Sequence, residues 1–552
     1  MPHVNRRSVL TGAGAAAAAL AAGSTARAAA ADPAPPAVPD ATVDAGGFCA
    51  DPFAQPAVVL PGDERYAELS TGVNQRWTAT PDSVVLPTTT AQVLRIVQAA
   101  ALNRTRVTVR SGGHCYADFV SNAETKTIID LSHMNKVTYD ATRNAFAVEP
   151  GVQLGALYEA LYRSWGVAVP GGVCLTVGIG GHAVGGGFGL LTRQHGLVAD
   201  HLDAVEMVVV DRFNRARVVT ASRNPADPAN DLWWASTGGG GGNFGIITKY
   251  WFRTPGAPGT APGDQLPRPP KTVLISSVAV PWAALDQTAF TTLLRNFGQW
   301  YEQNSAPGAP ATALSGVMFA RHRTGGGVGL LTQVDGTDPN GPQLLADYAA
   351  ALTRGTAINP VFPARRLPWL ASTKLIGTFN PTLLFDPTLR SGIKTAFLRT
   401  AFTDDQAGAI YRQLMRTDFA NPNATLQLAG AGGQMNAPAS GATATAHRSS
   451  VLFAEFESFW INPADDAANT AWLRDIYGET FATTGGYPAP NAQNDGCYIN
   501  NPDPDIVDPA VNRSGVPWST LYYGDNYARL QQVKSRWDPT DFFHHSQSIR
   551  PA

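Results

Sequence analysis

Residues 170–189 read PGGVCLTVGIGGHAVGGGFG, a stretch dominated by glycine and small apolar residues. Two further glycine-rich segments lie on either side of it in the chain: RSGGHCYADF at residues 110–119 and STGGGGGNFGIIT at residues 236–248. Glycines let the backbone approach a ligand closely, and the N–H groups of such loops can hold phosphate oxygens. Flexibility alone explains one such loop more readily than three. The three loops together therefore predict an extended ligand that bears phosphate.

None of the three loops matches a dinucleotide fingerprint or a phosphate loop in the strand-to-helix context that those motifs require. Two of the loops carry a side chain that can form a covalent bond, His114 in the first and Cys174 in the second. In isolation, His114 is best explained as a hydrogen-bonded structural histidine and Cys174 as a buried, inert thiol. Neither residue by itself indicates a site.

The segments around these loops alternate between strand-like and helical patterns. SVVLP at residues 83–87 is a short β-rich run, TTT supplies a helix cap, and AQVLRIVQAAL has apolar residues at helical spacing. The alternation continues through VTVR, TIIDLS, AFAVEPG and LGALYEALYRSWG. This pattern predicts an α+β domain over residues 49–255.

Residues 255–270 are rich in proline and glycine and mark a domain boundary, because such residues rarely lie inside a helix or strand. Strand-like runs alternate with helical stretches beyond this boundary, which predicts a second domain over residues 256–499. We expect a large mixed sheet there, with one face available to build a pocket. Residues 500–552 form a separate C-terminal segment.

The N-terminus has the pattern of an export signal. Arg6 and Arg7 precede an Ala-rich run, and residues 26–28 form an A-x-A-like cleavage site. Paired arginines before a weakly hydrophobic stretch indicate the twin-arginine route, which carries folded proteins. A disordered Ala-rich tail is the alternative. Residues 1–28 are therefore predicted to be a signal peptide and residues 29–48 an Ala/Pro-rich linker, and the protein is expected to be secreted.

The composition excludes some classes of partner. The formal net charge is −2 and only 15% of the residues are charged, so nothing steers the chain toward nucleic acid. The N-terminal run is too short to span a membrane, and no later stretch qualifies. The spacing of the cysteines is wrong for zinc, and no metal is expected. A disulfide could join two of the cysteines, which are Cys49, Cys115, Cys174 and Cys497.

RSGGH, GGVCLTVGIGGH, GGGGGNFGIIT and the C-terminal WDPTDFFHHSQSI, in this order, resemble the berberine-bridge-enzyme-like branch of the vanillyl-alcohol-oxidase family. The resemblance covers nearly the whole chain after the predicted signal and is closest to bicovalent actinobacterial glycoside oxidases. It implies a two-domain, PCMH-type FAD-binding fold whose substrate domain is built on a large antiparallel sheet. It further implies that His114 bonds to the flavin 8α-methyl and Cys174 to its C6 carbon. The C-terminal segment would complete the FAD domain.

The resemblance also implies which residues contact the flavin. These expected contacts lie in the three loops and in one segment near residue 500: Arg110, Ser111, Gly112, Gly113, His114, Cys115, Gly172, Cys174, Val177, Gly178, Gly181, His182, Gly186, Gly187, Gly242, Asn243, Gly245, Ile247, Tyr498 and Asn500. Val177, three residues after the cysteine, resembles the oxidase members and implies molecular oxygen as the electron acceptor.

GCYINNPD at residues 496–503 resembles the Tyr-x-Asn segment of the family, in which the tyrosine is the catalytic base of carbohydrate-oxidising members. Tyr498 is therefore the expected base. An ordinary tyrosine has a pKa of about 10 and would need a nearby cation or hydrogen-bond donor to act near neutrality. An aromatic ring packed between domains is the alternative explanation.

The chain departs from the family pattern at two positions. Ala431 stands where many relatives have a second tyrosine, and Asn501 replaces the tyrosine of the YxNY pattern. A mechanism with one tyrosine is therefore expected. Glu455 and Glu457 alternate along one strand and would point to the same side, so either could face the pocket or both could face solvent.

Together these features predict an exported FAD-dependent oxidase. Its substrate would be an alcohol of a sugar, oligosaccharide or glycosylated secondary metabolite, with oxygen reduced to hydrogen peroxide. Two alternatives stay open. The enzyme could instead carry out oxidative ring closure or lactol oxidation on a polyketide or alkaloid, or the protein could bind flavin without turnover.

Overall fold

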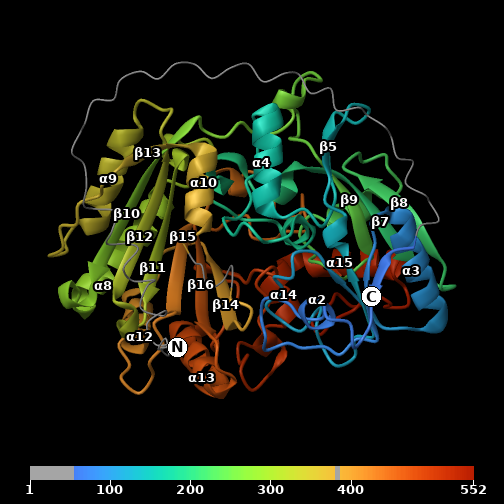
Figure 1. Ribbon diagram of the computed structural model, residues 1–552. Coiled ribbons are helices and arrows are strands. Elements are labelled where there is room, and N and C mark those ends of the chain that lie inside the picture. Colours follow the sequence, from blue (N-terminus) through green and yellow to red (C-terminus); the bar gives the residue numbers. More distant parts are fainter. Residues whose placement is uncertain (1–54, 380–385) are drawn as a thin grey trace, which may run out of the picture. The chain divides into compact units, whose positions relative to one another are not determined.

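The computed structural model of the protein contains three β-sheets (Figure 1). It describes residues 55–379 and 386–552. The predicted signal peptide over residues 1–28, the linker over residues 29–48 and Cys49 lie outside the described residues.

The first sheet positions the first glycine-rich loop. Its strands, in spatial order, are β1 (Ala57–Val59), β2 (Ser83–Leu86), β4 (Thr127–Asp130) and β3 (Val107–Arg110). Strands β2, β4 and β3 are parallel, and helix α3 (Thr90–Asn103) makes the crossover from β2 to β3. As predicted, the TTT run caps this helix, because Thr89 accepts a hydrogen bond from the N–H of Gln92. The loop after Arg110 therefore starts at the carboxyl ends of three parallel strands.

The second sheet leads into and out of the other two loops. Its antiparallel strands, in spatial order, are β5 (Val137–Asp140), β6 (Ala145–Val148), β9 (Ile246–Phe252), β7 (Leu202–Val210) and β8 (Ala216–Ser222). Besides α3, the helices between the strands of the first two sheets are α2 (Tyr66–Leu69), α4 (Leu154–Trp165), α5 (Ile179–His182), α6 (Thr192–His195) and α7 (Asn230–Ala235). Helix α4 ends where Gly166 adopts a φ of 71°, and the second glycine-rich stretch follows four residues later.

The third sheet has eight strands and is antiparallel throughout. Its strands, in spatial order, are β13 (Arg365–Pro368), β10 (Thr272–Pro281), β12 (Gly327–Asp335), β11 (Leu314–Arg321), β15 (Ala424–Gly430), β16 (Leu452–Trp460), β14 (Arg390–Leu398) and β17 (Asn494–Gly496). The large antiparallel sheet implied by the family resemblance is present. The mixed sheet expected from the strand and helix alternation was wrong.

The mixed-sheet prediction was wrong because of the way the helices connect the strands. The helices between these strands are α8 (Gln287–Gln303), α9 (Gly341–Thr353), α10 (Trp369–Gly377), α12 (Asp404–Leu414) and α13 (Asp466–Thr480). Helices α8, α9, α12 and α13 each return the chain to a strand of the same direction, but one intervening strand separates the two. Helical crossovers therefore occur without any parallel neighbours.

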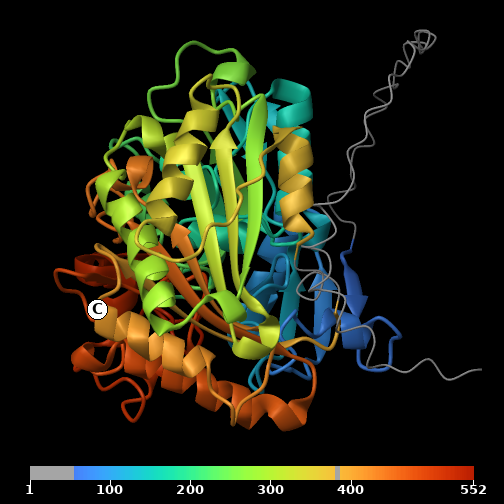
Figure 2. The same ribbon diagram turned by 90° about the vertical axis from the view of Figure 1, so that its left-hand side faces the viewer.

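The two faces of this sheet differ in chemistry. Helices α8, α9, α12 and α13 cover one face, as Figure 2 shows from the side. Phe456 of β16 points to that face, where its ring lies 5.3 Å from the ring of Tyr477 on α13. Strand residues alternate between faces, so Glu455 and Glu457 point to the opposite face. The face opposite these four helices therefore carries this acid pair.

The C-terminal residues return to the first two sheets. Helix α14 (Trp518–Tyr523) is followed by α15 (Tyr527–Trp537), which packs on α7 just before the third glycine-rich loop. Phe543 joins the apolar cluster beneath α3 that contains Val93. Residues far apart in sequence thus share one core.

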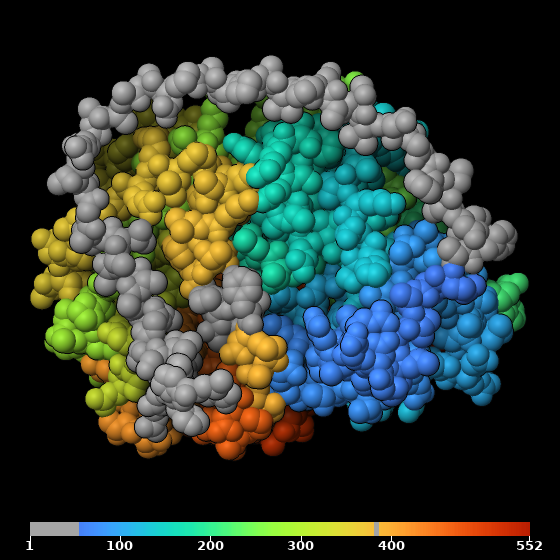
Figure 3. Space-filling model, in the orientation of Figure 1, coloured from blue at the N-terminus to red at the C-terminus, as the bar shows by residue number. Residues whose placement is uncertain are grey.

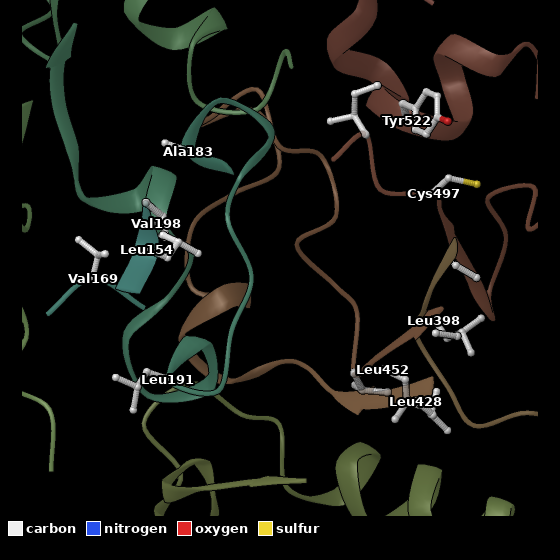
Figure 4. Packing of buried hydrophobic residues seen from close by; sticks show 14 of the residues in the cluster. Leu154, Val169, Ala183, Leu191, Val198, Leu398, Leu428, Leu452, Cys497 and Tyr522 are labelled. Atoms are coloured by element: carbon white, nitrogen blue, oxygen red, sulfur yellow. The ribbon is translucent and has the colours of Figure 1, made fainter. Parts of the chain in front are cut away.

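Residues 57–552 form one compact unit. Figure 4 shows side chains of one apolar cluster, some from the region of the second loop, such as Ala183, and others from strands of the large sheet, such as Leu428. At the surface, α10 lies against α4 (Figure 3). The ring of the buried Trp369 lies 5.2 Å from that of Tyr162. The predicted boundary near residue 255 falls between β9 and β10, and the division into domains stays a prediction.

None of the helices in the described ranges has both the length and the hydrophobicity to cross a bilayer.

Candidate functional site

The first two glycine-rich loops touch through their backbones. A Cβ atom on Gly112 would lie 2.3 Å from the backbone nitrogen of Gly178, and a Cβ atom on Gly178 would lie 2.0 Å from Oγ of Ser111. The Ser111 hydroxyl donates a hydrogen bond of 2.6 Å to the carbonyl of Pro150. Only glycine permits this approach, so the two loops meet because neither position carries a side chain.

The third loop joins the second through a hydrogen bond of 3.0 Å from the N–H of Gly240 to the carbonyl of Val184. Asn243 holds the third loop together, because its amide donates to the carbonyl of Gly239 at 2.9 Å. The amide oxygen of Asn243 accepts from the N–H of Ile549 at 2.8 Å. The three loops and the C-terminal segment therefore form one continuous structure.

Two further contacts attach the C-terminal segment to the loops. Lys534 is fully buried and donates to the carbonyl of Asn243 at 2.6 Å and to Asp538 at 2.7 Å. The ring of His545 stacks on Phe119 of the first loop, with 3.7 Å between ring centroids. The C-terminal segment thus packs against the first and third loops.

His114 and Cys174 converge on one hydroxyl group. Nε2 of His114 lies 2.9 Å from Oγ1 of Thr176, and Sγ of Cys174 lies 3.7 Å from the same oxygen. Burial lowers the pKa of His114 to about 4, so the imidazole is neutral near pH 7. Burial raises the pKa of Cys174, while hydrogen bonds from Thr176 act in the opposite direction. Two potential nucleophiles therefore lie side by side.

The other two cysteines in the described ranges are free thiols held in the protonated form. Burial raises the pKa of Cys115 to about 11 and that of Cys497 to about 12. The described part of the chain contains no disulfide between Cys115, Cys174 and Cys497. A pairing with Cys49 falls outside the described residues.

Tyr498 is buried, with its phenolic oxygen facing two N–H donors. The backbone N–H of Gly187 and the side-chain amide of Asn500 each donate to this oxygen at 2.9 Å. The ring packs edge-on against Phe397 and Phe453. Burial raises the pKa of Tyr498 to about 12, and the hydrogen bond from Asn500 acts against this increase.

Asn500 links Tyr498 to the second loop. Its amide also donates to the carbonyl of His182 at 2.9 Å. A Cβ atom on Gly185 would lie 2.0 Å from the amide oxygen of Asn500, so this approach again requires glycine. Nε2 of His182 accepts from the N–H of Gly172 at 3.1 Å, consistent with burial that lowers the pKa of His182 to about 4.

Other residues predicted to contact the flavin use their side chains within the protein. Arg110 forms an ion pair with Asp130 and donates to the carbonyl of Thr71 at 2.6 Å. The side chain of Ile247 packs in the main apolar cluster. Only the backbone groups of Arg110 and Ile247 therefore remain for a ligand. The rest of the predicted set lies along the three loops: Gly113, Val177, Gly181, Gly186, Gly242 and Gly245.

Glu455 and Glu457 lie on the face of the eight-stranded sheet opposite helices α8, α9, α12 and α13, and both are partly buried. Glu455 accepts hydrogen bonds from the amides of Gln427 and, at 2.8 Å, Asn501. Burial raises the pKa of Glu455 to about 7. Burial and then the charge of Glu455 raise the pKa of Glu457 well above its ordinary value, while Arg321 opposes this. The pair is therefore not a solvent-facing one.

Tyr116 shows that this acid pair belongs to the same site as Cys174. Burial raises the pKa of Tyr116 well above its ordinary value, and the charges of Glu457 and Cys174 raise it further. Tyr116 therefore lies near both the acid pair and Cys174.

Sequence reasoning missed several residues of the site. Thr176 lies inside the quoted second loop, two residues after Cys174, and its spacing could have drawn attention to it. Tyr116 likewise lies inside the quoted first loop, two residues after His114. Gln427 and Arg321 carry no such signal, because only strand register brings them to the site. Within the described ranges, no group of three acidic, histidine or cysteine side chains could hold a metal ion.

These features fit a flavin dinucleotide. The glycine loops offer backbone N–H groups at positions that side chains would fill, and a neutral imidazole lies next to a cysteine thiol.

Residues 81–211 match the family described as FAD binding domain, and residues 497–550 match the family described as berberine and berberine like. The aclacinomycin-N/aclacinomycin-A oxidase of Streptomyces galilaeus is 46% identical over 518 residues, which cover 93% of this chain and 93% of the relative. The chain belongs to the berberine-bridge-like family of FAD-linked oxidases.

Other members of the berberine-bridge-like family are also similar over most of their length. The hexose oxidase of Chondrus crispus is 30% identical over 543 residues, covering 88% of this chain and 93% of the relative. A glycopeptide hexose oxidase crystallised with teicoplanin is 42% identical, with a TM-score of 0.86 over 90% of this chain and 99% of that one. The predicted α+β, PCMH-type FAD-binding fold is confirmed, and so is the prediction of an FAD-linked oxidase acting on CH–OH groups with oxygen as acceptor.

Proposed function

We propose that this berberine-bridge-like oxidase is an exported enzyme that oxidises an alcohol of a sugar, oligosaccharide or glycosylated secondary metabolite and releases hydrogen peroxide. When bound, FAD supplies the hydride acceptor. The observation that carries the proposal is the phenolic oxygen of Tyr498, which faces two N–H donors in a buried site.

The contacts of Tyr498 support its role as the base. A hydroxyl group must lose its proton as a hydride leaves the carbon that bears it. The N–H groups of Gly187 and Asn500 stabilise a phenolate over a neutral phenol, which offsets part of the effect of burial. Ala431, at the position where many relatives have a tyrosine, lies in the apolar cluster around Tyr498. One tyrosine therefore acts alone in this proposal.

The proposed cofactor linkage uses both nucleophiles, with His114 bonded to the 8α-methyl of the flavin and Cys174 to C6. Their shared contact with Thr176 supports this, because two bonds to one ring require two neighbouring side chains. Two covalent bonds abolish cofactor dissociation and favour a more oxidising flavin. Val177 in the same loop supports oxygen as the acceptor.

The proposed substrate class follows from the polar sheet face. Glu455, Glu457, Gln427 and Arg321 offer acceptors and donors that suit a ring with several hydroxyl groups. The hexose oxidase and glycopeptide hexose oxidase among the relatives support a sugar.

The cofactor linkage is tested by acid denaturation of the purified protein. The yellow colour should stay with the polypeptide, and mass spectrometry should find flavin on peptides that contain His114 and Cys174. The single variants His114→Ala and Cys174→Ala should each keep one bond, and the double variant should release its flavin. A colourless polypeptide after denaturation of the wild type would contradict the proposed linkage.

Export through the twin-arginine route belongs to the same proposal and is supported by the pattern of residues 1–28. Replacing Arg6 and Arg7 with lysine should retain the protein inside the producing cell. Equal amounts of wild type and variant in the culture medium would contradict this route.

A further inference from the structure

Two consecutive residues of strand β14 hold the two ends of the segment that contains Tyr498. We propose that the buried ion pair between Lys394 and Asp503 positions Tyr498 and Asn500 for proton removal, which makes Lys394 a positioning residue of the reaction. This inference rests on the proposed role of Tyr498 as the base.

Thr395 holds the first end of the segment. Its Oγ1 accepts a hydrogen bond of 3.0 Å from the backbone N–H of Tyr498. Just before Tyr498, strand β17 pairs with β14, with Gly496 opposite Phe397. The backbone of Tyr498 is therefore placed directly against β14.

Lys394 holds the second end. Its Nζ donates to the two carboxylate oxygens of Asp503 at 2.9 and 2.7 Å, and to Asp505 at 2.9 Å. It also donates to the hydroxyl of Tyr487 at 3.2 Å. The side chains of Lys394 and Asp503 are only 4% and 7% exposed, so water cannot replace these bonds if one partner is lost.

The two anchors lie on opposite faces of the sheet. Thr395 pairs with Glu455 on the polar face, whereas Lys394 pairs with Phe456, which packs toward α13. The segment from Tyr498 to Asp503 therefore crosses the sheet edge beyond β17. Its path is defined by one anchor on each face.

Between the anchors lies Asn500, whose amide must reach both Tyr498 and the carbonyl of His182. Beyond it, Asn501 donates to Glu455 at 2.8 Å, and the backbone of Asp503 donates to the Tyr522 hydroxyl at 3.0 Å and accepts from Gln547 at 2.7 Å. The Asp503 carboxylate is held by Lys394 and by the Tyr487 hydroxyl at 2.6 Å. Loss of Lys394 would leave this buried carboxylate without its counter-charge, and the resulting shift of the segment would move Asn500. Tyr498 would then lose a donor that stabilises its phenolate.

The test compares Lys394→Met with Arg390→Met in the flavin-loaded enzyme. Arg390 lies on the same strand, but its side chain binds Asp466 at 2.6 Å and the carbonyl of Gln75 at 2.8 Å, away from the Tyr498 segment, and so serves as the matched control. Three quantities are measured: the flavin content, the rate of anaerobic flavin reduction by a sugar substrate, and the pH profile of kcat/KM.

Lys394→Met should keep its flavin and reduce it at least tenfold more slowly. The apparent pKa of the base should rise, because the phenolate loses hydrogen-bond donors. Arg390→Met should stay within twofold of the wild type with an unchanged pH profile. A folded, flavin-loaded Lys394→Met enzyme with wild-type reduction rate and pH profile would overturn the inference.

If Lys394→Met does not fold, Asp503→Asn and Asp505→Asn decide the question. Both carboxylates bind Lys394, but only Asp503 is the anchored end of the segment. Asp503→Asn should slow flavin reduction and raise the apparent pKa, and Asp505→Asn should do neither; equal effects of the two variants would refute the inference. Tyr498→Phe is assayed in parallel. Retained turnover in Tyr498→Phe removes the proposed base, whereas an inactive Tyr498→Phe beside a fully active Lys394→Met removes only the positioning role.

Discussion

The proposed attachment region around Thr176 and the proposed base region around Tyr498 are built in different ways. His114, Thr176 and Cys174 belong to two loops whose backbones touch through glycines. Tyr498 receives hydrogen bonds from Gly187, 311 residues earlier in the chain, and has its own backbone held by β14. The first region depends on close backbone approach and the second on side chains from distant segments.

This difference predicts which substitutions affect flavin attachment and which affect turnover. Substitutions that separate the loops should reduce flavin attachment, whereas substitutions around the 498–503 segment should slow turnover and leave the flavin in place. Four predictions test this separation.

The largest effect is expected for Tyr498→Phe. Loss of the base should slow flavin reduction by about 10² to 10⁴-fold. The flavin content should equal that of the wild type, because the phenol contributes nothing to attachment. Stopped-flow absorbance of the flavin measures both. Tyr66→Phe, which removes a hydroxyl bonded to the carbonyl of Pro81, serves as a control with normal turnover. A similar loss in both variants would contradict the assignment.

Gly178→Ala tests the contact between the loops. Its Cβ would lie 2.0 Å from Ser111 Oγ and 2.4 Å from the backbone nitrogen of Gly112. The free energy of unfolding should fall by about 2 to 3 kcal/mol, and the fraction of protein with two flavin bonds should drop. Urea unfolding and intact-protein mass spectrometry measure these effects. Gly478→Ala in helix α13, where a Cβ meets open space, should instead raise stability by about 0.5 to 1 kcal/mol. Normal flavin attachment in Gly178→Ala would break the comparison.

Glu455→Gln tests the polar face beside the base region. Burial raises the pKa of Glu455 from 4.5 to about 7, so the folded protein keeps a proton that the unfolded chain releases. Stability of the wild type should therefore fall as the pH rises from about 4.5 to 7. Glu455→Gln should reduce this fall and be more stable than the wild type by about 2 kcal/mol at pH 8. Thermal unfolding at pH 5 and pH 8 provides the measurement. The exposed Glu124→Gln should keep the wild-type dependence on pH; an identical slope in all three proteins would rule out a buried, titrating Glu455.

Thr176→Ala should give the smallest effect. Loss of the hydroxyl shared by His114 and Cys174 should slow formation of the flavin bonds by about tenfold, which corresponds to about 1.4 kcal/mol. Thr176→Ser keeps the hydroxyl and should attach flavin at the wild-type rate. Mass spectrometry during reconstitution of the apoprotein with FAD follows the reaction. Equal rates for the alanine and serine variants would show that the hydroxyl plays no part.

Much of the attachment region could be predicted from the sequence because its signals are local. The three glycine-rich loops, the cap of α3 at Thr89 and the strand before Arg110 can each be recognised within about fifteen residues. Tyr498 could be predicted as the base only from the resemblance of GCYINNPD to a family segment. Neither the donor at Gly187 nor the anchor at Lys394 leaves a pattern in the sequence.

The eight-stranded sheet shows the same limit. The sequence indicates its strands and helices, but the mixed sheet expected from their alternation is wrong, since every helical crossover skips a strand. The two-residue period correctly placed Glu455 and Glu457 on one side. Which side faces the site depends on the helices that cover the other face.

Glycine content and hydrophobic periodicity, which are properties of neighbouring residues, determined the expectation of a phosphate-bearing ligand and the alternation of strands and helices, and the family resemblance added flavin and the two candidate attachment residues. The tertiary structure alone decided that His114 and Cys174 share the Thr176 hydroxyl, that Glu455 faces Gln427 and Asn501, and that Lys394 anchors the segment of Tyr498. These contacts depend on strand register and on packing across a shared core, which no short stretch of sequence specifies.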